Sequence, residues 1–318
     1  MDGQDTQGSA IQIVMASDDA YIQHLAVAAV SVMTNVRRGR SVHFHFLSCG
    51  LSEENKSKIS RIFQNGIHRH SFYELDQAVL KSYPIFNHIS PASYARLFLD
   101  AILPVSVTKL IYLDADTVVS GDIAELYDLG MKGHSLAAVS DIMARDIVRI
   151  FFYPGLHDYF NAGVLVIDLD QWRRRHLQAE ANDFIRLHET ELLGADQDVL
   201  NCLFREAWLP LDSRFNVDLK HRFFWEKINP SAVILHYSDR IKPWHYQFTG
   251  PGRKYYYEYL ARTPWAGFRP SWSAAGMWRK YRGLVIRVLK YLARHLVPAA
   301  WQDNYRTRLW RNFKRKKI

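Results

Sequence analysis

The chain has 318 residues, of which 48% are hydrophobic, 14% aromatic and 23% charged, a composition that is typical of globular proteins and excludes a disordered chain or a coiled coil. Its two cysteines, Cys49 and Cys202, are too few and too far apart for a zinc knuckle or a disulfide framework, which favours a reducing cytosol. The charge is uneven, because residues 269–318 carry a net +13 and residues 1–268 a net −4. We therefore expect a main domain over 1–268 and a basic tail over 269–318.

Short apolar runs alternate with helical patterns along the main domain. The runs expected as strands are 11–16, 42–47, 109–113, 136–140 and 163–168. The expected helices are 21–36, 53–64, 92–102, 179–189 and 197–206, the second of them with Ser52 as its N-cap. This alternation predicts an α/β domain with a mostly parallel sheet covered on both faces.

Acidic residues follow several of these strands. Asp18 and Asp19 follow the first strand, Asp114 and Asp116 the third, and Asp141 the fourth. Ligands of parallel sheets bind beyond the carboxyl ends of the strands, so these residues are candidates for a site. Because the sequence has neither of the glycine-rich phosphate loops of dinucleotide-binding proteins and P-loop NTPases, a cation would have to hold any phosphate bound here.

Asp114 and Asp116 are separated by one residue, so both carboxylates lie on one side of an extended backbone and could hold a hard divalent cation. Acids at this position are also common as loop residues or helix caps. His236 ends an apolar run and could add an imidazole ligand, and Lys242 follows six residues later. Both also have an ordinary interpretation: His236 could be a hydrogen-bonded histidine with no ligand role, and Lys242 a solvated charge.

Seven short segments, which include those around Asp114 and His236, resemble in sequence and in order the family 8 glycosyltransferases, especially the bacterial lipopolysaccharide and lipooligosaccharide galactosyl- and glucosyltransferases. The resemblance covers about residues 10–265. It rests on Ala16-Ser17-Asp18-Asp19, His88-Ile89-Ser90 with Ser93-Tyr94-Ala95-Arg96, Leu113-Asp114-Ala115-Asp116, Phe160-Asn161-Ala162-Gly163, Asp196-Gln197-Asp198, Ser213-Arg214-Phe215-Asn216, and His236-Tyr237 with Lys242-Pro243-Trp244. It implies a GT-A fold, which is a Rossmann-like nucleotide-sugar-binding domain, with Mn²⁺ (Mg²⁺ being possible) and retention of anomeric configuration.

The resemblance also implies roles for individual residues. Asp114, Asp116 and His236 would bind the metal. Gln197, Asp196 and Asp141 would be catalytic, near the anomeric carbon of the donor. The donor, UDP-galactose or UDP-glucose, would contact Ala16, Asp18, Asp19, Tyr21, Ser93, Arg96, Ala115, Asn161, Gly163 and Lys242, with Asp18 and Tyr21 at the uracil and Lys242 at the diphosphate. Asp239-Arg240-Ile241 departs from the Gly- and Pro-rich stretch of relatives. Asp239 would repel that diphosphate unless Arg240 neutralises it or the loop turns it outward.

The basic tail contains a helical pattern over 276–297 that Pro298 ends, followed by aromatic residues from Trp301 to Phe313. Basic residues mixed with aromatic ones suit an anionic lipid surface better than a nucleic acid. A solvated tail is the ordinary alternative. We expect a cytoplasmic enzyme at the inner face of the inner membrane, because no signal peptide and no apolar run of about 20 residues occurs in the sequence. The expected reaction is hexose transfer to a lipid-linked oligosaccharide acceptor. A metal-dependent nucleotidyltransferase and a non-catalytic membrane-binding adaptor are the alternatives.

Overall fold

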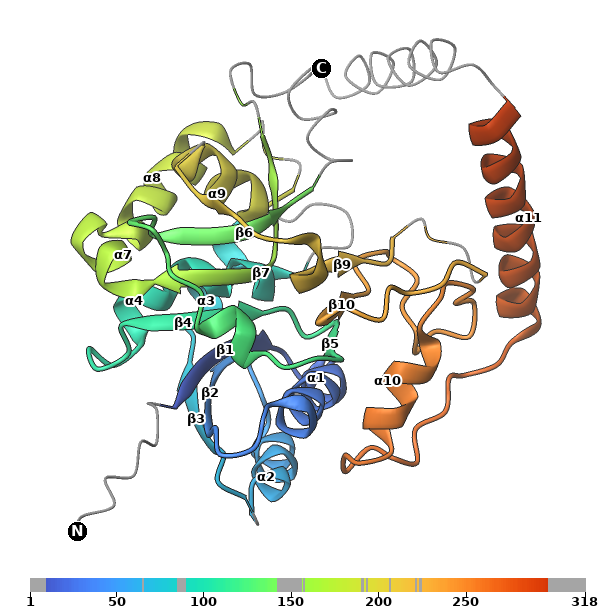
Figure 1. Cartoon of the computed structure of the whole chain (residues 1–318), viewed down its shortest axis with the longest axis horizontal. Helices are drawn as coiled ribbons and strands as arrows, with labels where there is room; N and C mark the ends of the chain where they lie inside the picture. The colour runs from blue at the N-terminus through green and yellow to red at the C-terminus, as the bar shows by residue number, and fades with distance from the viewer. Residues whose placement is uncertain are drawn as a thin grey trace.

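The computed structural model describes residues 10–64, 66–84, 90–141, 156, 158–189, 192, 194–205, 207–220, 222 and 225–296. His88 and Ile89 of the resemblance motifs, and the aromatic segment from Trp301 to Phe313, lie outside these residues. An α/β body is followed by a C-terminal helix that runs along one side of the molecule (Figure 1).

The central sheet has seven strands within the described residues, in the order β3-β2-β1-β4-β7-β6-β8. These are β1 (Ile11–Ser17), β2 (Val42–Ser48), β3 (Arg69–Glu74), β4 (Lys109–Leu113), β6 (Leu136–Ser140), β7 (Phe160–Asp168) and β8 (Leu209–Pro210). β1 pairs in parallel with β2 and β4, whereas β7 runs antiparallel to β4 and β6. The predicted mostly parallel sheet is correct. The direction of β7 could not be predicted, because an apolar run is the same in either direction.

A second, three-stranded sheet has the order β5-β10-β9 among the described residues. Its strands are β5 (Thr117–Val119), β9 (Val217–Asp218) and β10 (Ile234–His236). β10 pairs antiparallel with β5, with His236 opposite Thr117. This pairing brings a late segment of the chain beside the loop that follows β4.

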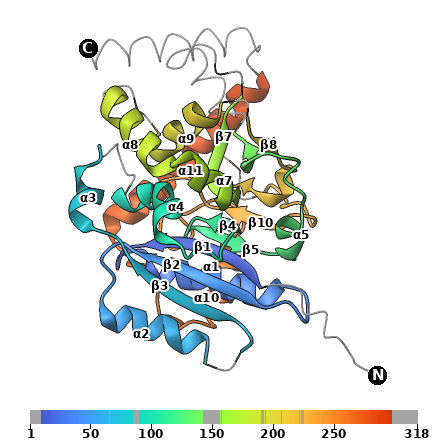
Figure 2. The same cartoon turned by 90° about the vertical axis from the view of Figure 1, so that its left-hand side faces the viewer.

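Helices cover both faces of the central sheet, as Figures 1 and 2 show. One face packs against the 3₁₀ helix η1 (Pro91–Phe98) and against α4 (Leu99–Ile102), α7 (Leu169–Arg175), α8 (Leu177–His188) and α9 (Asp196–Phe204). The other face packs against α1 (Ile22–Asn35), α2 (Glu53–Ile62) and α5 (Ala124–Tyr127). The remaining elements are α3 (Gln77–Ser82), η2 (Ser213–Phe215), α10 (Arg253–Leu260) and α11 (Ala274–Leu296).

Helix α1 is apolar around most of its circumference, which is typical of a helix that is buried on all sides. Its outer side is covered by α10 and the small sheet. The few polar groups of α1 are satisfied there, since Gln23 Nε2 donates to the Tyr256 hydroxyl at 3.0 Å and His24 Nδ1 lies 2.6 Å from the same oxygen. α10 therefore completes the core of the α/β body.

The helix predicted over 92–102 is only partly α-helical. Residues 91–98 form the 3₁₀ helix η1, with Ser90 as N-cap and Pro91 in its first turn, and α4 follows directly. In η1 the carbonyl of Ser93 accepts a hydrogen bond from Arg96 Nε at 3.1 Å, and the Arg96 side chain is buried.

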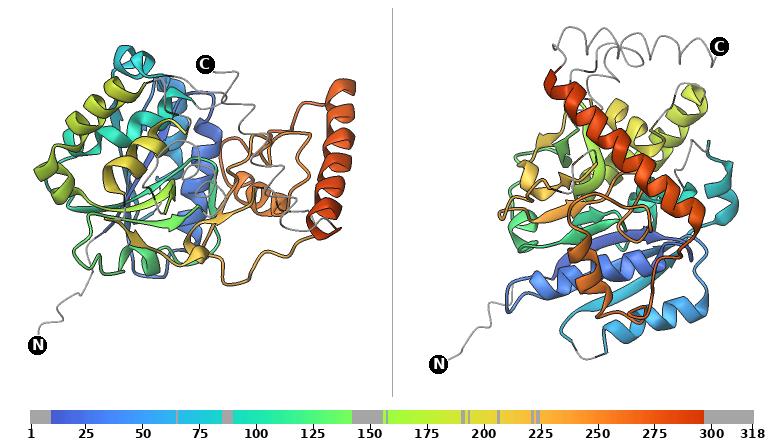
Figure 3. Two further views of the ribbon diagram at one scale, coloured as in Figure 1. Left: turned by 90° about the horizontal axis from the view of Figure 1, so that it is seen from above. Right: turned by 90° about the vertical axis from the view of Figure 1, so that its right-hand side faces the viewer.

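Helix α11 lies beside α10 and the loops near β9 and β10 (Figures 1 and 3). It begins and ends close to the predicted limits of 276 and 297. Many of its large apolar side chains are exposed, namely Met277, Trp278, Tyr281, Val285, Ile286, Val288, Leu289 and Leu292. No helix in the described part of the chain is long and apolar enough to cross a bilayer.

Candidate functional site: an acidic cleft at the strand ends

Asp114, Asp116 and His236 meet at the carboxyl end of β4. The Asp114 amide donates to the Gly163 carbonyl at 2.8 Å, which holds the end of β4 against β7. The Asp116 carbonyl accepts the Tyr237 amide at 3.0 Å, which holds the small sheet at the same place. As a result, one ligand atom from each of the three side chains lies within 4.8 Å of the other two.

His236 is oriented so that one ring nitrogen faces the carboxylates. Asn216 Nδ2 donates to Asn161 Oδ1 at 2.9 Å, which leaves Asn216 Oδ1 to accept from His236 Nδ1 at 3.0 Å. His236 Nε2 then lies 3.2 Å from Asp116 Oδ1 and 3.9 Å from Asp114 Oδ2. Burial lowers the pKa of His236, but the Asp116 carboxylate outweighs it, so the net pKa is raised.

The donor set fits a divalent cation. Asp116 Oδ1 is buried and has no hydrogen-bond partner within the described chain. An imidazole nitrogen and carboxylate oxygens from two residues face the same small volume. This ligand set suits Mn²⁺ better than Mg²⁺, because Mg²⁺ prefers a shell of oxygen ligands only. Asn216 fixes the tautomer of His236, which is how ligand histidines in metal sites are usually held.

Gly163 is the residue that allows this close packing. A Cβ at this position would lie 2.3 Å from His236 Cε1 and 2.8 Å from Asp114 Oδ2. These distances are well inside van der Waals contact, so any side chain here would displace a candidate ligand. Gly163 shapes the cation site by its lack of a side chain.

Lys242 reaches the same carboxylates from the loop after β10. Its Nζ lies 2.6 Å from Asp116 Oδ2 and 2.7 Å from the Tyr237 carbonyl. Burial alone would raise the pKa of Asp116, but the charges of Lys242 and His236 hold it well below its usual range. Burial lowers the pKa of Lys242, and Asp116 more than compensates, so that pKa is raised. The loop is anchored by Trp244, whose ring stacks on His24 with 3.5 Å between centroids.

Arg96 joins the cation site to the next part of the cleft. Its guanidinium is almost fully buried and bonds Asp114 Oδ1 at 2.7 Å, Asp196 Oδ2 at 2.8 Å and the Ala162 carbonyl. Burial raises the pKa of Asp196 to about 6, although the Arg96 charge opposes that shift. Arg96 therefore positions two carboxylates whose charges would otherwise repel each other.

These residues line a cleft of about 360 Å³. Of the residues predicted for the site, the lining contains Ala16, Asp18, Tyr21, Ser93, Arg96, Asp114, Ala115, Asp116, Asp141, Asn161, Gly163, Asp196, Gln197, His236 and Lys242. The structure thus gathers these predicted side chains, contributed by segments from β1 to the loop after β10, around one cleft.

Asp19 does not line the cleft. Its Oδ1 accepts hydrogen bonds from the Ser52 amide at 2.9 Å and from Asn55 Nδ2 at 2.8 Å, at the start of α2. The side chain is therefore turned toward a helix N-terminus, where a carboxylate is favoured by the helix dipole. Asp239 is also outside the lining, and its Oδ1 accepts the Arg240 amide at 2.7 Å, so the departure from the family pattern does not put a carboxylate into the cleft.

Other lining residues had no predicted role. Asp218, Lys220 and Ser238 lie at the small sheet, where Ser238 Oγ donates to Asp218 Oδ1 at 2.5 Å. β9 has only two residues, which is too short to give a periodic pattern. Asn216 belongs to a quoted motif, but only the hydrogen bond to His236 shows what its side chain does.

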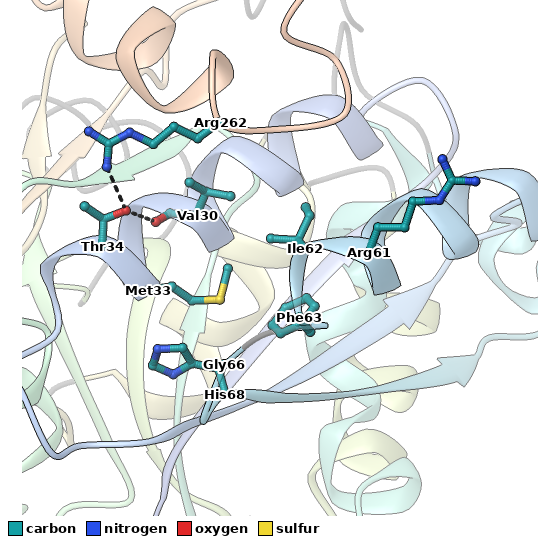
Figure 4. A pocket seen from close by; sticks show the side chains of 9 residues that line it. All are labelled: Val30, Met33, Thr34, Arg61, Ile62, Phe63, Gly66, His68 and Arg262. Carbon is teal, nitrogen blue, oxygen red and sulfur yellow. Dashed lines mark hydrogen bonds between the residues drawn. The ribbon is translucent and has the colours of Figure 1, made fainter.

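A second cavity, of about 310 Å³, lies between α1, α2 and the residues just before β3 (Figure 4). Its lining is Val30, Met33, Thr34, Arg61, Ile62, Phe63, Gly66, His68 and Arg262. Because no carboxylate is among these residues, this cavity lacks the ligands for a divalent cation. The acidic cleft is the candidate active site.

An α/β fold with a candidate cation site at the carboxyl edge of its sheet is compatible with several classes of enzyme, and comparison with known proteins identifies the family. The model of glycosyl transferase family 8 matches residues 12–247. The chain therefore belongs to glycosyl transferase family 8, which confirms the resemblance deduced from the sequence.

Individual relatives agree with this assignment. General stress protein A of Bacillus subtilis (strain 168) is 28% identical over 80% of this chain and 94% of its own length. Lipopolysaccharide 1,2-glucosyltransferase of Escherichia coli (strain K12) is 28% identical over 82% of this chain and 80% of its own length. The crystal structure of galactosyltransferase LgtC with donor and acceptor sugar analogues matches with a TM-score of 0.72 and 27% identity, over 85% of this chain and 100% of LgtC. This likeness confirms the predicted GT-A fold.

Proposed function

We propose that this glycosyltransferase moves a galactose or glucose residue from a UDP-sugar to the lipid-linked oligosaccharide of a lipopolysaccharide or lipooligosaccharide core, with Mn²⁺ and with retention. The convergence of Asp114, Asp116 and His236 in the cleft is the observation that carries the proposal. The E. coli relative is named as a lipopolysaccharide glucosyltransferase and LgtC as a galactosyltransferase, so both hexoses are included.

The chemistry of transfer requires stabilising the charge that develops on the diphosphate as the glycosidic bond breaks. A divalent cation bound by Asp114, Asp116 and His236 would supply part of that stabilisation. The Lys242 ammonium lies at the same place and supplies a second, fixed positive charge. Lys242 therefore serves the diphosphate end of the donor, and Asp18 and Tyr21 line the cleft where the uracil would bind.

Retention is best explained by a same-face displacement. The acceptor oxygen bonds to the anomeric carbon on the side from which the diphosphate leaves, and the leaving phosphate oxygen takes the acceptor proton. The candidates near the anomeric carbon make poor covalent nucleophiles, because Gln197 carries a neutral amide and the Asp196 carboxylate is bonded to Arg96 at 2.8 Å. Asp141 also lines the cleft, and we assign it to the donor hexose together with Gln197 and Asp196.

Residues 271–318 would associate with an anionic membrane surface, and the enzyme would act at the cytoplasmic face of the inner membrane. This proposal is supported by α11, whose exposed Trp278, Val285 and Leu289 accompany the basic Arg279 and Arg282. A lipid-linked acceptor would lie at the same surface. No nucleic acid is needed for this reaction.

The proposal is tested by a donor screen with Mn²⁺, in which the full chain is given each common nucleotide sugar and a lipooligosaccharide acceptor. Release of UDP with a new α-linked hexose, detected by NMR, is the expected result. Asp114→Asn and Asp116→Asn should lower turnover at least about 100-fold, because each removes a charged ligand.

Other outcomes point to the alternatives. Release of pyrophosphate from a nucleoside triphosphate would indicate a nucleotidyltransferase. Tight liposome binding with no turnover of any nucleotide sugar would indicate an adaptor. Near wild-type rates for both Asn variants in metal-buffered assays would rule out the proposed cation site.

A further inference from the structure

The side-chain amide of Gln197 is held at both ends by groups outside α9. Its Oε1 accepts the Ala162 amide at 2.9 Å, and its Nε2 donates to the Tyr159 hydroxyl at 3.1 Å. Ala162 lies in β7 and Tyr159 lies just before it, so the strand positions a side chain from the neighbouring helix. Gln197 also lines the cleft, which makes its orientation relevant to anything bound there.

An amide has nearly the same shape when its oxygen and nitrogen are exchanged, so only the surrounding hydrogen bonds decide which end points where. The Ala162 N–H can only donate and therefore selects Oε1. A tyrosine hydroxyl can donate or accept, and alone it would select neither end. The Gln197 amide has a single orientation only if the Tyr159 hydroxyl donates its proton to another acceptor.

Asp198 is that acceptor. The Tyr159 hydroxyl donates to Asp198 Oδ1 at 2.6 Å, and Asp198 Oδ2 accepts the Gly194 amide at 2.7 Å. Tyr159 and Asp198 are both almost completely buried. Burial and the adjacent Asp198 charge raise the pKa of Tyr159 well above its usual value, so the phenol keeps its proton and gives it to the carboxylate. Toward Gln197 the Tyr159 oxygen can then only accept.

The backbone around Asp198 is built for this contact. A Cβ on Gly194 would lie 2.8 Å from Asp198 Oδ1 and 3.2 Å from the Tyr159 hydroxyl oxygen. Asn201, one turn further along α9, joins the same two elements by accepting the Phe160 amide at 2.8 Å and donating to the Phe160 carbonyl at 2.9 Å. The segment from Tyr159 to Phe160 and the helix are thus joined at two points, Asp198 and Asn201, that follow Gln197 in α9.

We propose that Tyr159, with its proton held by Asp198, is a positioning residue that presents the Gln197 amide to the donor sugar in a single orientation. The inference rests on the proposed function, since it assigns Gln197 to the anomeric region. The second N–H of Nε2 and the second lone pair of Oε1 remain for the sugar. Without Tyr159 the amide would rotate or exchange its ends, and a donor could still bind while the reacting geometry is lost.

The test uses the full chain with Tyr159→Phe, which keeps the ring and removes the hydroxyl. We expect kcat to fall about tenfold or more, with the donor KM and the UDP Kd changed less than about twofold, because the amide acts as charge develops. Tyr83→Phe is the matched control, since Tyr83 is also buried and donates to a side chain, Asn182, away from the cleft. Its kcat should not change.

A double-mutant cycle separates positioning from general packing. If Tyr159 acts through Gln197, Tyr159→Phe has no further effect on kcat in the Gln197→Ala background. The side-chain amide signal of Gln197 in ¹⁵N NMR, identified by its loss in Gln197→Ala, should shift in Tyr159→Phe and stay in place in Tyr83→Phe. An undiminished effect of Tyr159→Phe in that background, or an unmoved Gln197 signal, would overturn the proposal.

Asp198→Asn provides a second variant if Tyr159→Phe does not fold. An amide at 198 can donate to the Tyr159 oxygen and turn its proton toward Gln197, which would favour the exchanged amide. We expect the Gln197 side-chain amide signal to shift in Asp198→Asn. An unshifted signal would contradict the proposal that Asp198 holds the Tyr159 proton. The NMR readout needs no turnover, so it decides the positioning role even if the donor screen finds no UDP-hexose activity.

Discussion

Lys242 Nζ lies 2.6 Å from Asp116 Oδ2, although the two residues are 126 positions apart in the chain. The contact joins the loop after β10 to the loop after β4, and both side chains are largely withdrawn from solvent. Breaking a buried ion pair by removing one partner leaves the other charge uncompensated, which is far more costly than losing an exposed pair.

Lys242→Met should therefore lower the free energy of unfolding by about 3–5 kcal/mol and also weaken UDP binding. Denaturant titration and calorimetry with UDP measure the two effects. Lys58→Met is the control, because the Lys58–Glu54 ion pair lies on the exposed side of α2, and it should leave both quantities unchanged. Equal behaviour of the two variants would show that Lys242 is an ordinary surface charge.

Gly163→Ala should abolish Mn²⁺ binding, because the new methyl group would lie 2.3 Å from His236 Cε1 and force a ligand aside. Gly130→Ala is the matched change, since a Cβ there has no atom within 4 Å. Mn²⁺ titration by calorimetry or electron paramagnetic resonance should distinguish the two. Unaltered Mn²⁺ affinity in Gly163→Ala would place the cation elsewhere.

His236→Ala should weaken Mn²⁺ binding more than Mg²⁺ binding, because the lost nitrogen ligand favours the softer ion. Calorimetric titration with each metal, in the presence of UDP, gives the ratio of the two affinities. His134→Ala is the control, because His134 is half-buried and lies outside the cleft lining, and it should not alter the ratio. The same Mn²⁺ titration for wild type and His236→Ala would contradict the assignment of His236.

Stability should fall as the pH is lowered below about 6.5, because His45 is buried in neutral form. Burial lowers the pKa of His45 to about 3, so the unfolded chain takes up a proton that the folded chain does not. Above the unfolded pKa of about 6.5, His45 has no effect on the free energy of unfolding. Between pH 6.5 and 5, protonation of His45 in the unfolded chain lowers that free energy by about 2 kcal/mol.

Urea titrations at pH 7.5 and 5.0 measure this loss. His45→Gln should lose less stability over that interval than wild type, since glutamine does not titrate. His45 Nε2 donates to Gln12 Oε1 and its Nδ1 accepts from the Tyr73 hydroxyl, so a lower stability of the variant at both pH values is expected and does not affect the comparison. An identical pH dependence would exclude His45 as a source of acid sensitivity.

Truncation after about Pro270 should leave a folded domain that still uses a short, soluble acceptor but loses activity on membrane acceptors. The cleft residues all precede this point, and among the described contacts of α11 with the body Lys280 Nζ lies over the Tyr246 ring at 4.9 Å. Sedimentation with anionic and neutral liposomes tests the membrane role. The full chain should bind anionic liposomes, and binding should weaken as salt screens the charges.

Two results would contradict this expectation. The full chain could ignore anionic liposomes at low salt, or the truncated chain could bind them equally well. A truncated chain that does not unfold cooperatively would show instead that α11 belongs to the folding unit.

The sequence alone was enough to predict features that depend on neighbouring residues. Alternating apolar runs indicated an α/β fold, because each strand needs one stretch of apolar side chains and each helix one apolar face. The D-x-D spacing put Asp114 and Asp116 on the same side of an extended segment, and the charge count separated the tail from the main domain. The acids after the strands were candidates from their positions alone, whereas Arg96, Asp196 and Gln197 were named only because seven motifs occur in a family order.

Only the tertiary structure decided how these residues act on one another. Asp18 and Asp19 are adjacent in sequence, yet one lines the cleft and the other accepts hydrogen bonds from Ser52 and Asn55 at the start of α2. Asn216 stood in a quoted motif without a role, and Tyr159 had no predicted role; only the structure shows that they bond His236 and Gln197. Hydrogen bonds between residues far apart in the chain depend on strand order, strand direction and close packing, and none of these is encoded in the spacing of a single segment.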